Sequence, residues 1–297
     1  MNFNRSWGAL IAVCICTFNA FAQKTIVEKL PSNINSSEYD EISPIISHQS
    51  DALLFTRVAY PVFEQTIFHE GEDLSSTLSK RQYEATLNEI YSEIAGRKVV
   101  EATYSSYNQD IWIAAFNGNS FGKVSHPGYP LNNALPNSIS STTEDDDTYV
   151  TINQFEFDGG MQRGFSTVRR VQNNWTHPVP MTIDNYYTQH PDVGLSMSSD
   201  GQILILSLKR KDSKGSTDLY YCRRKSESVW SEPINMGPVI NSYGREITPH
   251  LSADQKMMFF ASNRDHKNPQ TDIYISYRLD DSWTNWSEPK RLANPIN

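Results

Sequence analysis

The residues Gly118, Ser120 and Gly122 have the Gly-x-Ser-x-Gly spacing of a nucleophile elbow, which presents a serine for acyl transfer. The elbow requires an apolar strand before the serine and a helix after it. Here the serine follows Asn117-Gly118-Asn119, a sequence typical of a turn between two strands. The sequence therefore predicts a hairpin turn at Ser120 and no serine nucleophile.

Metal and cofactor sites are judged by ligand type and spacing. The run Glu144-Asp145-Asp146-Asp147 offers the hard oxygen ligands that calcium prefers, but we favour a solvated hairpin turn. The seven histidines are scattered, and neither His-x-x-x-His nor Cys-x-x-Cys spacing occurs, so zinc is not expected. The sequence has no glycine-rich phosphate loop. We expect no catalytic residue, no metal and no cofactor.

A repeated phrase runs through the chain. Ile-Asn-Ser occurs at 34–36 and 240–242, and Glu41-Ile42-Ser43-Pro44 follows the first copy as Glu246-Ile247-Thr248-Pro249 follows the second. Self-similarity at a fixed period is typical of architectures in which each unit packs on its neighbours. Copies of the phrase start at Asn35, Asn132, Asn185, Asn241 and Asn297, with spacings of 97, 53, 56 and 56 residues.

Each copy predicts the same order of strands. A turn rich in aspartate leads into a continuous apolar run, which indicates a strand covered on both faces. Sheets arranged as blades around an axis cover their middle strands in this way. A third strand begins at Asp110, Asp218 or Asp272, and a fourth follows a tryptophan-containing turn. We predict an all-β propeller with four recognisable four-stranded blades. The apolar runs are 53–55, 149–152, 203–206 and 257–260.

The tryptophans Trp175, Trp230 and Trp286 recur once per repeat. A row of exposed indole rings could stack on sugars. Buried indoles would instead fill the space between adjacent sheets, and we favour this second interpretation because one tryptophan falls in each closing turn.

The first copy is longer than the others, and its excess lies at about 64–107. Within it, apolar residues recur at helical spacing, and Gly96 ends the pattern. We predict a helix near 79–95 in an insertion of the first blade. It either packs on the propeller or contacts a partner, and Tyr83 and Tyr91 are candidate partner residues. The apolar face consists of Tyr83, Leu87, Ile90, Tyr91 and Ile94.

The Ser-x-Asp-Gly turn at 198–201, the Asp-Ile-Tyr strand at 272–274 and the ending Trp283-Thr284-Asn285-Trp286-Ser287-Glu288-Pro289 resemble the TolB-type, WD-repeat-like β-propeller repeat. More narrowly, they are similar to the propeller region of exported OmpA-family envelope proteins of Bacteroidetes-type bacteria. The last two repeats carry the resemblance most strongly. It implies a propeller without catalytic residues that works beside other envelope proteins. The OmpA-like, peptidoglycan-binding segment of that family is not found in this sequence.

Charged residues beside two predicted inner strands are the candidates for a partner or ligand face. An enzyme built on a propeller would need paired carboxylates or a histidine converging there. Charges are also expected at this place because the loops meet water. We therefore favour a binding scaffold for cell-envelope proteins or a glycan, and the alternative is a glycan- or peptide-active enzyme. The candidates are Glu38, Asp40, Glu41, Arg245 and Glu246.

The first 22 residues have the features of a secretory signal peptide. Arg5 supplies a positive charge, Ala9 to Phe18 form a short apolar segment, and Ala20-Phe21-Ala22 offers a cleavage site. This segment is shorter than the roughly 20 residues that a membrane span needs. We expect residues 23–297 to be exported without a transmembrane segment, to the periplasm or in association with the outer membrane or cell surface.

Charge and cysteine content narrow the function classes further. The net charge of −8 disfavours non-specific binding to nucleic acid or anionic membranes. After removal of the signal peptide Cys222 is the remaining cysteine, so no internal disulfide is expected, and we interpret Cys222 as a packed thiol rather than a nucleophile.

The same phrase stands at 30–35 and at 292–297. The four blades therefore form either a minimal closed ring or an open, incomplete array, and we favour the open form. An open array would leave an apolar sheet face uncovered, which promotes self-association.

Overall fold

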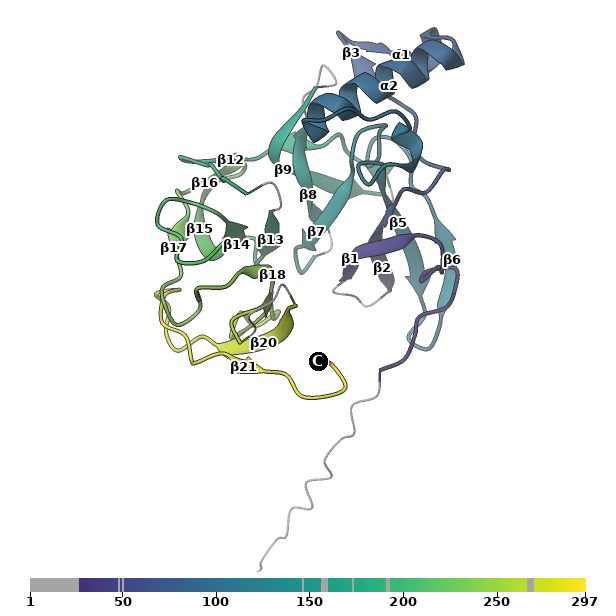
Figure 1. The fold of residues 1–297 in the computed structure, drawn as a ribbon. Coiled ribbons are helices and arrows are strands. Elements are labelled where there is room, and N and C mark those ends of the chain that lie inside the picture. Colours follow the sequence, from purple (N-terminus) through teal and green to yellow (C-terminus); the bar gives the residue numbers. More distant parts are fainter. Residues whose placement is uncertain are drawn as a thin grey trace, which may run out of the picture.

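The computed structural model describes residues 27–297 except 48, 50, 146, 156–159, 173, 191–192 and 266–269. The predicted signal peptide, residues 1–22, lies outside the described residues. Four antiparallel sheets follow one another along the chain as the blades of a β-propeller, which confirms the predicted fold (Figure 1).

Blades 1 and 4 are the regular ones, with four strands in chain order. Blade 1 contains β1 (Asp40–Ile46), β2 (Ala52–Val58), β5 (Gln109–Phe116) and β6 (Phe121–Ser125). Blade 4 contains β18 (Glu246–Leu251), β19 (Met257–Ser262), β20 (Asp272–Tyr277) and β21 (Lys290–Arg291).

Blades 2 and 3 differ at the outer edge, where two short strands replace the single fourth strand. Blade 2 contains β7 (Ser138–Thr142), β8 (Thr148–Phe155), β9 (Met161–Val171), β10 (Asn174–Trp175) and β11 (Val179–Pro180). Blade 3 contains β13 (Gly194–Met197), β14 (Ile203–Leu208), β15 (Asp218–Ser226), β16 (Val229–Trp230) and β17 (Ile234–Asn235). β12 (Thr182–Ile183) pairs parallel with β16, so the end of blade 2 is tied to blade 3.

The aspartates of the predicted turns cap the hairpins between the first and second strands. The hydroxyl of Ser198 donates to Asp200 at 2.6 Å, and that of Ser252 donates to Asp254 at 2.6 Å. Thr143 and Asp145 make the same contact at 2.5 Å in blade 2. Such side-chain bonds stabilise tight turns. Glu144 and Asp145 of the predicted run therefore lie in a hairpin turn, and Asp146 lies outside the described residues. Among the residues that the structure describes, no group of three or more ligands could hold a metal ion.

Apolar residues from adjacent blades form the core. Ile203 and Ile205 of blade 3 pack with Met258 and Phe260 of blade 4. Trp230 and Trp286 are 1% and 3% exposed within the inter-blade clusters. The tryptophans therefore pack between blades, as predicted, rather than form a sugar-stacking row.

The asparagines of three of the five copies of the repeated phrase make the same pair of backbone hydrogen bonds. Asn241 accepts a hydrogen bond from the Leu219 backbone N–H and donates to the Leu219 carbonyl, at 2.7 and 3.0 Å. Asn132 clamps Ile111 in the same way at 2.8 and 2.9 Å. Asn297 clamps Ile273 at 2.8 and 2.9 Å. Each clamp fastens the connector to the third strand of the blade it leaves.

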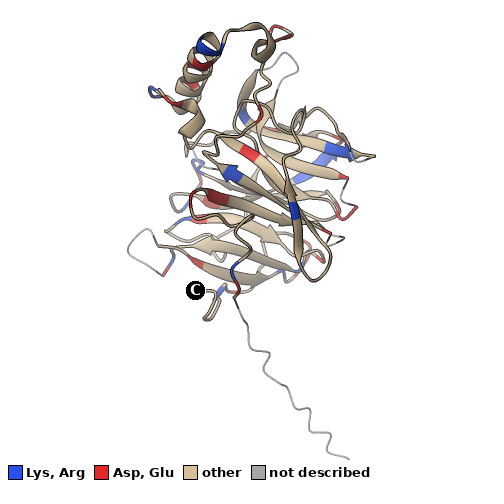
Figure 2. Ribbon diagram, turned by 90° about the vertical axis from the view of Figure 1, so that its right-hand side faces the viewer, with Lys and Arg blue, Asp and Glu red and all other residues tan. Residues whose placement is uncertain are grey.

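The insertion of blade 1 connects β2 to β5. It contains β3 (Phe68–His69), β4 (Glu72–Asp73), α1 (Leu74–Thr77), α2 (Lys80–Ala95) and a 3-10 turn (Ala102–Tyr104). The predicted helix near 79–95 is thus α2. A capping box at Ser79 begins it, and Gly96 with a φ of 63° ends it. Figure 2 shows the insertion projecting beyond the sheets.

The four blades form an arc, with blade 1 and blade 4 at its two ends (Figure 1). The innermost strands β1, β7, β13 and β18 lie side by side in that order. The far face of blade 4 leaves Ile273 and Tyr277 38% and 45% exposed. In the described part of the chain, no helix has the length and apolar character of a membrane span.

Candidate functional site

Two of the five candidate charges are tied into the fold, Glu41 as a half-buried residue and Glu246 as a buried one. Glu41 pairs with Arg57 at 3.0 Å, and its other oxygen accepts from the Ser36 backbone at 3.1 Å. Glu246 is fully buried, and its carboxylate accepts from Ser242 and Ser262 at 2.6 and 2.8 Å. These carboxylates hold the repeated phrase against the first strand of the blade.

The remaining candidates lie in different places. Glu38 and Asp40 are exposed at the start of blade 1. Tyr83 and Tyr91 face inward from α2, where the Tyr83 hydroxyl donates to the Gln65 carbonyl and the Tyr91 hydroxyl donates to Ala134, both at 2.8 Å. The two tyrosines therefore pack the helix onto the propeller. The structure does not bring the seven candidates together.

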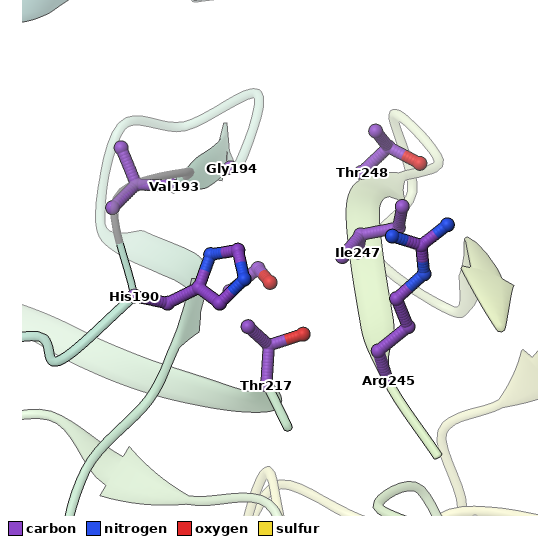
Figure 3. A pocket seen from close by; sticks show the side chains of 8 residues that line it. His190, Val193, Gly194, Thr217, Arg245, Ile247 and Thr248 are labelled. Carbon is purple, nitrogen blue, oxygen red and sulfur yellow. The ribbon is translucent and has the colours of Figure 1, made fainter. Parts of the chain in front are cut away.

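Arg245 lines a cavity between the innermost strands of blades 3 and 4. The cavity has a volume of about 130 Å³. His190, Val193 and Thr217 form one wall, and Arg245, Ile247 and Thr248 form the facing wall (Figure 3). Gly194 and Ser207 complete the lining.

Backbone contacts between two loops fix the floor of this cavity. The Ser216 N–H donates to the Gly244 carbonyl at 2.8 Å, and the Glu246 N–H donates to Thr217 at 3.0 Å. The loops approach so closely that a Cβ atom on Gly215 would lie 1.9 Å from the Gly244 oxygen. Glycine at 215 is therefore required, and the cavity walls are held by the fold rather than by flexible side chains.

The hydroxyl groups of the cavity have distinct roles. Ser207 and Thr217 both donate to the Glu246 carbonyl, at 2.7 and 3.1 Å. Each hydroxyl carries a single proton, so these two groups cannot also donate to a ligand. Thr248 is exposed and shares a wall with Arg245.

The loops beside the cavity carry exposed aromatic and basic side chains. Tyr243, two residues before Arg245, is 87% exposed, and the Lys214 ammonium lies 4.6 Å from its ring centre. Tyr187, which is 37% exposed, has the guanidinium of the buried Arg210 4.2 Å from its ring centre. An exposed tyrosine beside a cation is typical of a contact surface.

The groups that could act as nucleophiles are not activated. Ser120 lies in the turn between β5 and β6, and its hydroxyl contacts Asn117 at 3.4 Å. No helix follows it, so the elbow is absent as predicted. Cys222 is fully buried, and burial raises the pKa of its thiol to about 12. Only the thiolate is an effective nucleophile, so this cysteine is inert at neutral pH.

A buried polar network holds the insertion to blade 1. Asp110 contacts His126 Nε2 at 2.7 Å and accepts from the Glu64 backbone N–H at 2.7 Å and from Asn137 at 3.0 Å. Burial raises the pKa of Asp110, and the contact with His126 opposes that shift. The aspartate thereby fastens the loop that leaves β2. The sequence had indicated Asp110 only as the residue that begins the predicted third strand of its blade.

Other residues of the site had no signal in the sequence. His190, Val193 and Thr217 belong to loops and strands whose approach to Arg245 depends on how blades 3 and 4 pack. The repeat period of the sequence identifies equivalent positions in different blades. It does not show which side chains of one blade contact those of the next.

Comparisons with known proteins leave the function undecided. No protein-family model and no curated protein sequence matches the chain. Among solved structures, TolB from Acinetobacter baumannii has 10% identity and a TM-score of 0.40, over 81% of this chain and 41% of its own. A putative TolB from Agrobacterium tumefaciens has 13% identity and a TM-score of 0.42, over 86% of this chain and 62% of its own.

An enzyme is also among the similar structures. A puromycin-hydrolysing peptidase from Mycobacterium tuberculosis has 9% identity and a TM-score of 0.40, over 87% of this chain and 30% of its own. The chain thus spans less than two thirds of these three proteins, and the likeness does not single out one activity.

Proposed function

We propose that this protein is a non-enzymatic, exported β-propeller that serves as a protein-binding scaffold in the bacterial cell envelope, with the cavity between blades 3 and 4 as its contact site. The observation that carries the proposal is the make-up of that cavity. Its lining combines an arginine, a histidine and hydroxyl groups with apolar walls, and the eight described lining residues include no carboxylate and no thiol.

The chemistry of these residues favours binding over turnover. Glycoside hydrolysis ordinarily needs two carboxyl groups across the scissile bond. Glu246, adjacent in sequence to Arg245 and Ile247, is buried in bonds to Ser242 and Ser262, and Asp192, adjacent to Val193, lies outside the described residues. A serine nucleophile needs an adjacent base, but the Ser207 hydroxyl donates to a backbone carbonyl. Export and the envelope setting rest on the signal-peptide features and on the repeat resemblance.

A paired experiment tests binding against catalysis. The purified protein would be crosslinked in envelope extracts and recovered, and separately incubated with glycan and peptide libraries. A scaffold should recover defined envelope proteins and leave both libraries intact. Turnover that survives repurification and is lost in Arg245→Ala would instead establish the enzyme.

A further inference from the structure

We infer that Asn117 is a modification site: in the folded protein its side-chain amide reacts with the backbone nitrogen of Gly118, and an aspartate or isoaspartate takes its place. The site lies in the turn between β5 and β6 and shares no residue with the cavity between blades 3 and 4. The Gly-x-Ser-x-Gly sequence, which is not a nucleophile elbow here, thereby acquires a different chemical role.

The residue that follows Asn117 leaves the attacking nitrogen unhindered. Asn117 is the one asparagine of the sequence that precedes a glycine. The nitrogen of the next residue must reach the side-chain carbonyl carbon, and a side chain on that residue hinders its approach. Gly118 has a φ of 88°, and even a Cβ atom placed on it would meet no atom within 4 Å. Both residues are exposed, so water has access to the reacting groups.

The turn also activates the carbonyl group that is attacked. The Oδ1 atom of Asn117 accepts from the backbone N–H groups of Asn119 and Ser120 at 3.0 and 2.9 Å, and the Ser120 hydroxyl lies 3.4 Å away. Donors at such distances stabilise the negative charge that develops on a carbonyl oxygen under attack. The ring closed by the bond from Asn119 spans Gly118, so the carbonyl carbon stays beside the nitrogen that attacks it.

The reaction consumes only water. The Gly118 nitrogen gives its proton to solvent base and forms a bond to Cγ of Asn117, and the bond from Cγ to the side-chain nitrogen breaks. That nitrogen leaves as ammonia, and a five-membered succinimide ring remains. Water then opens the ring at either carbonyl, which gives aspartate or isoaspartate. No group is oxidised or reduced.

Buried asparagines lack this combination of features. Asn137 and Asn241 precede serine and are 2% and 1% exposed. Their side-chain nitrogens donate to backbone carbonyls, so the group that would have to leave is held in place. In the described part of the chain, the side-chain nitrogen of Asn117 makes no such bond. Asn119, exposed in the same turn but followed by serine, is the comparison that the chain itself provides.

The test follows the folded chain from Gln23 onward in mildly alkaline buffer, beside a synthetic peptide of residues 113–122. Peptide mapping by mass spectrometry locates each replacement of an amide by an acid. Anion-exchange chromatography separates the more acidic product, and Asn117→Asp supplies the reference for its elution. We expect Asn117 to convert in the folded chain at a rate comparable to that in the peptide, while Asn119 keeps its amide.

Three variants assign the reaction to the turn. Gly118→Ala should slow the conversion severalfold, because its methyl group hinders the attacking nitrogen. Asn117→Gln should nearly abolish it, because the longer side chain would have to close a six-membered ring. Asn174→Gln changes an exposed asparagine of blade 2 and should leave the conversion of Asn117 unchanged. Thermal melts establish that all three variants are folded.

The inference is overturned if Asn117 converts much more slowly in the folded chain than in the peptide, because the turn would then protect the amide. Equal conversion of Asn119 would also overturn it, as would a folded Gly118→Ala that converts as fast as the wild type.

Discussion

Cys222 shows how a side chain's surroundings decide its chemistry. It is fully buried in the core between blades 2 and 3, and burial raises the pKa of its thiol to about 12. We expect no reaction with a thiol-specific disulfide reagent at neutral pH in the folded chain from Gln23 onward, and full reaction after unfolding in urea. Rapid labelling of the native protein would show that the thiol is accessible.

Asp254 gives a prediction about acid. The hydrogen bond from Ser252 lowers the pKa of Asp254 from 3.8, with help from the Lys256 backbone. A carboxylate with a lowered folded pKa stabilises the protein fully above its unfolded pKa, and this contribution is lost as the pH falls through the folded pKa. Asp254→Asn should therefore destabilise the protein at neutral pH, and the deficit should shrink in acid.

Urea unfolding of the wild type and Asp254→Asn across the acidic range measures this convergence. Asp281→Asn is the control, because it removes an exposed carboxylate that lies outside the hairpin turn. A deficit that stays constant as the pH falls would refute the assignment of the cap.

Residue roles could be predicted only where neighbours in sequence decide them. The turn at Ser120 and the hairpin at 144–147 follow from adjacent residues. The ion pair of Glu41 could not be foreseen, because its partner Arg57 comes from the next strand. His190 lacked a signal because its approach to Arg245 is set by packing between blades.

At the scale of elements, the asparagine clamp recurs in three of the five copies of the repeated phrase. Asn241 is 1% exposed and makes two hydrogen bonds to Leu219. Each such bond is worth about 1 kcal/mol, so Asn241→Ala should lower the free energy of unfolding by about 2 kcal/mol. Asn33 is the control, because its exposed amide makes a single hydrogen bond, to the Gly122 carbonyl at 3.4 Å, and Asn33→Ala should cost much less. Equal losses in chemical denaturation would contradict the clamp.

The loops under the cavity allow a second comparison. Gly215→Ala would place a methyl group within 1.9 Å of a backbone oxygen, whereas Gly122→Ala meets its nearest atom at 3.7 Å. We expect the first change to lower the melting temperature by several degrees and the second to have little effect. A neutral Gly215→Ala would mean that the two loops can separate, and the cavity would then not be preformed.

The sequence predicts long elements better than short ones. The apolar runs place β2, β8, β14 and β19, and the helical spacing places α2 within one residue. The split edges of blades 2 and 3 were not predicted, because a pair such as Val179–Pro180 is a strand only through its bonding to β9. Two-residue strands carry no periodicity from which they could be recognised.

At the scale of the whole molecule, the arc leaves blade 4 with one uncovered face. Ile273 and Tyr277 are 38% and 45% exposed there, beside the half-buried Phe259 and Ile275. We expect the purified chain to bind a hydrophobic dye, and the double variant Ile273→Thr, Tyr277→Thr to bind less without a lower melting temperature. Val62→Thr removes an isolated exposed side chain and should leave dye binding unchanged. A dye-silent wild type would show that the face is covered.

The distribution of surface features over the molecule points to the binding face. The insertion buries Tyr83 and Tyr91 against blade 2 and the connector that leads into it, so these two tyrosines serve packing. The cavity between blades 3 and 4 combines a charged lining with an exposed tyrosine on the adjoining loop. The insertion joins a second to a third strand, and the cavity is lined by loops of that kind and by connectors between blades. In antiparallel blades these two kinds of loop emerge on the same side, so the insertion and the cavity lie on one face of the propeller.

Site-specific photo-crosslinking tests this account most directly. A photoreactive phenylalanine would replace Tyr243 beside the cavity or, for comparison, Tyr104 in the insertion, which are 87% and 65% exposed. Irradiation in envelope extracts should attach a defined protein at position 243. Crosslinks that form only at position 104, or at neither position, would contradict a scaffold that binds its partner through the cavity between blades 3 and 4.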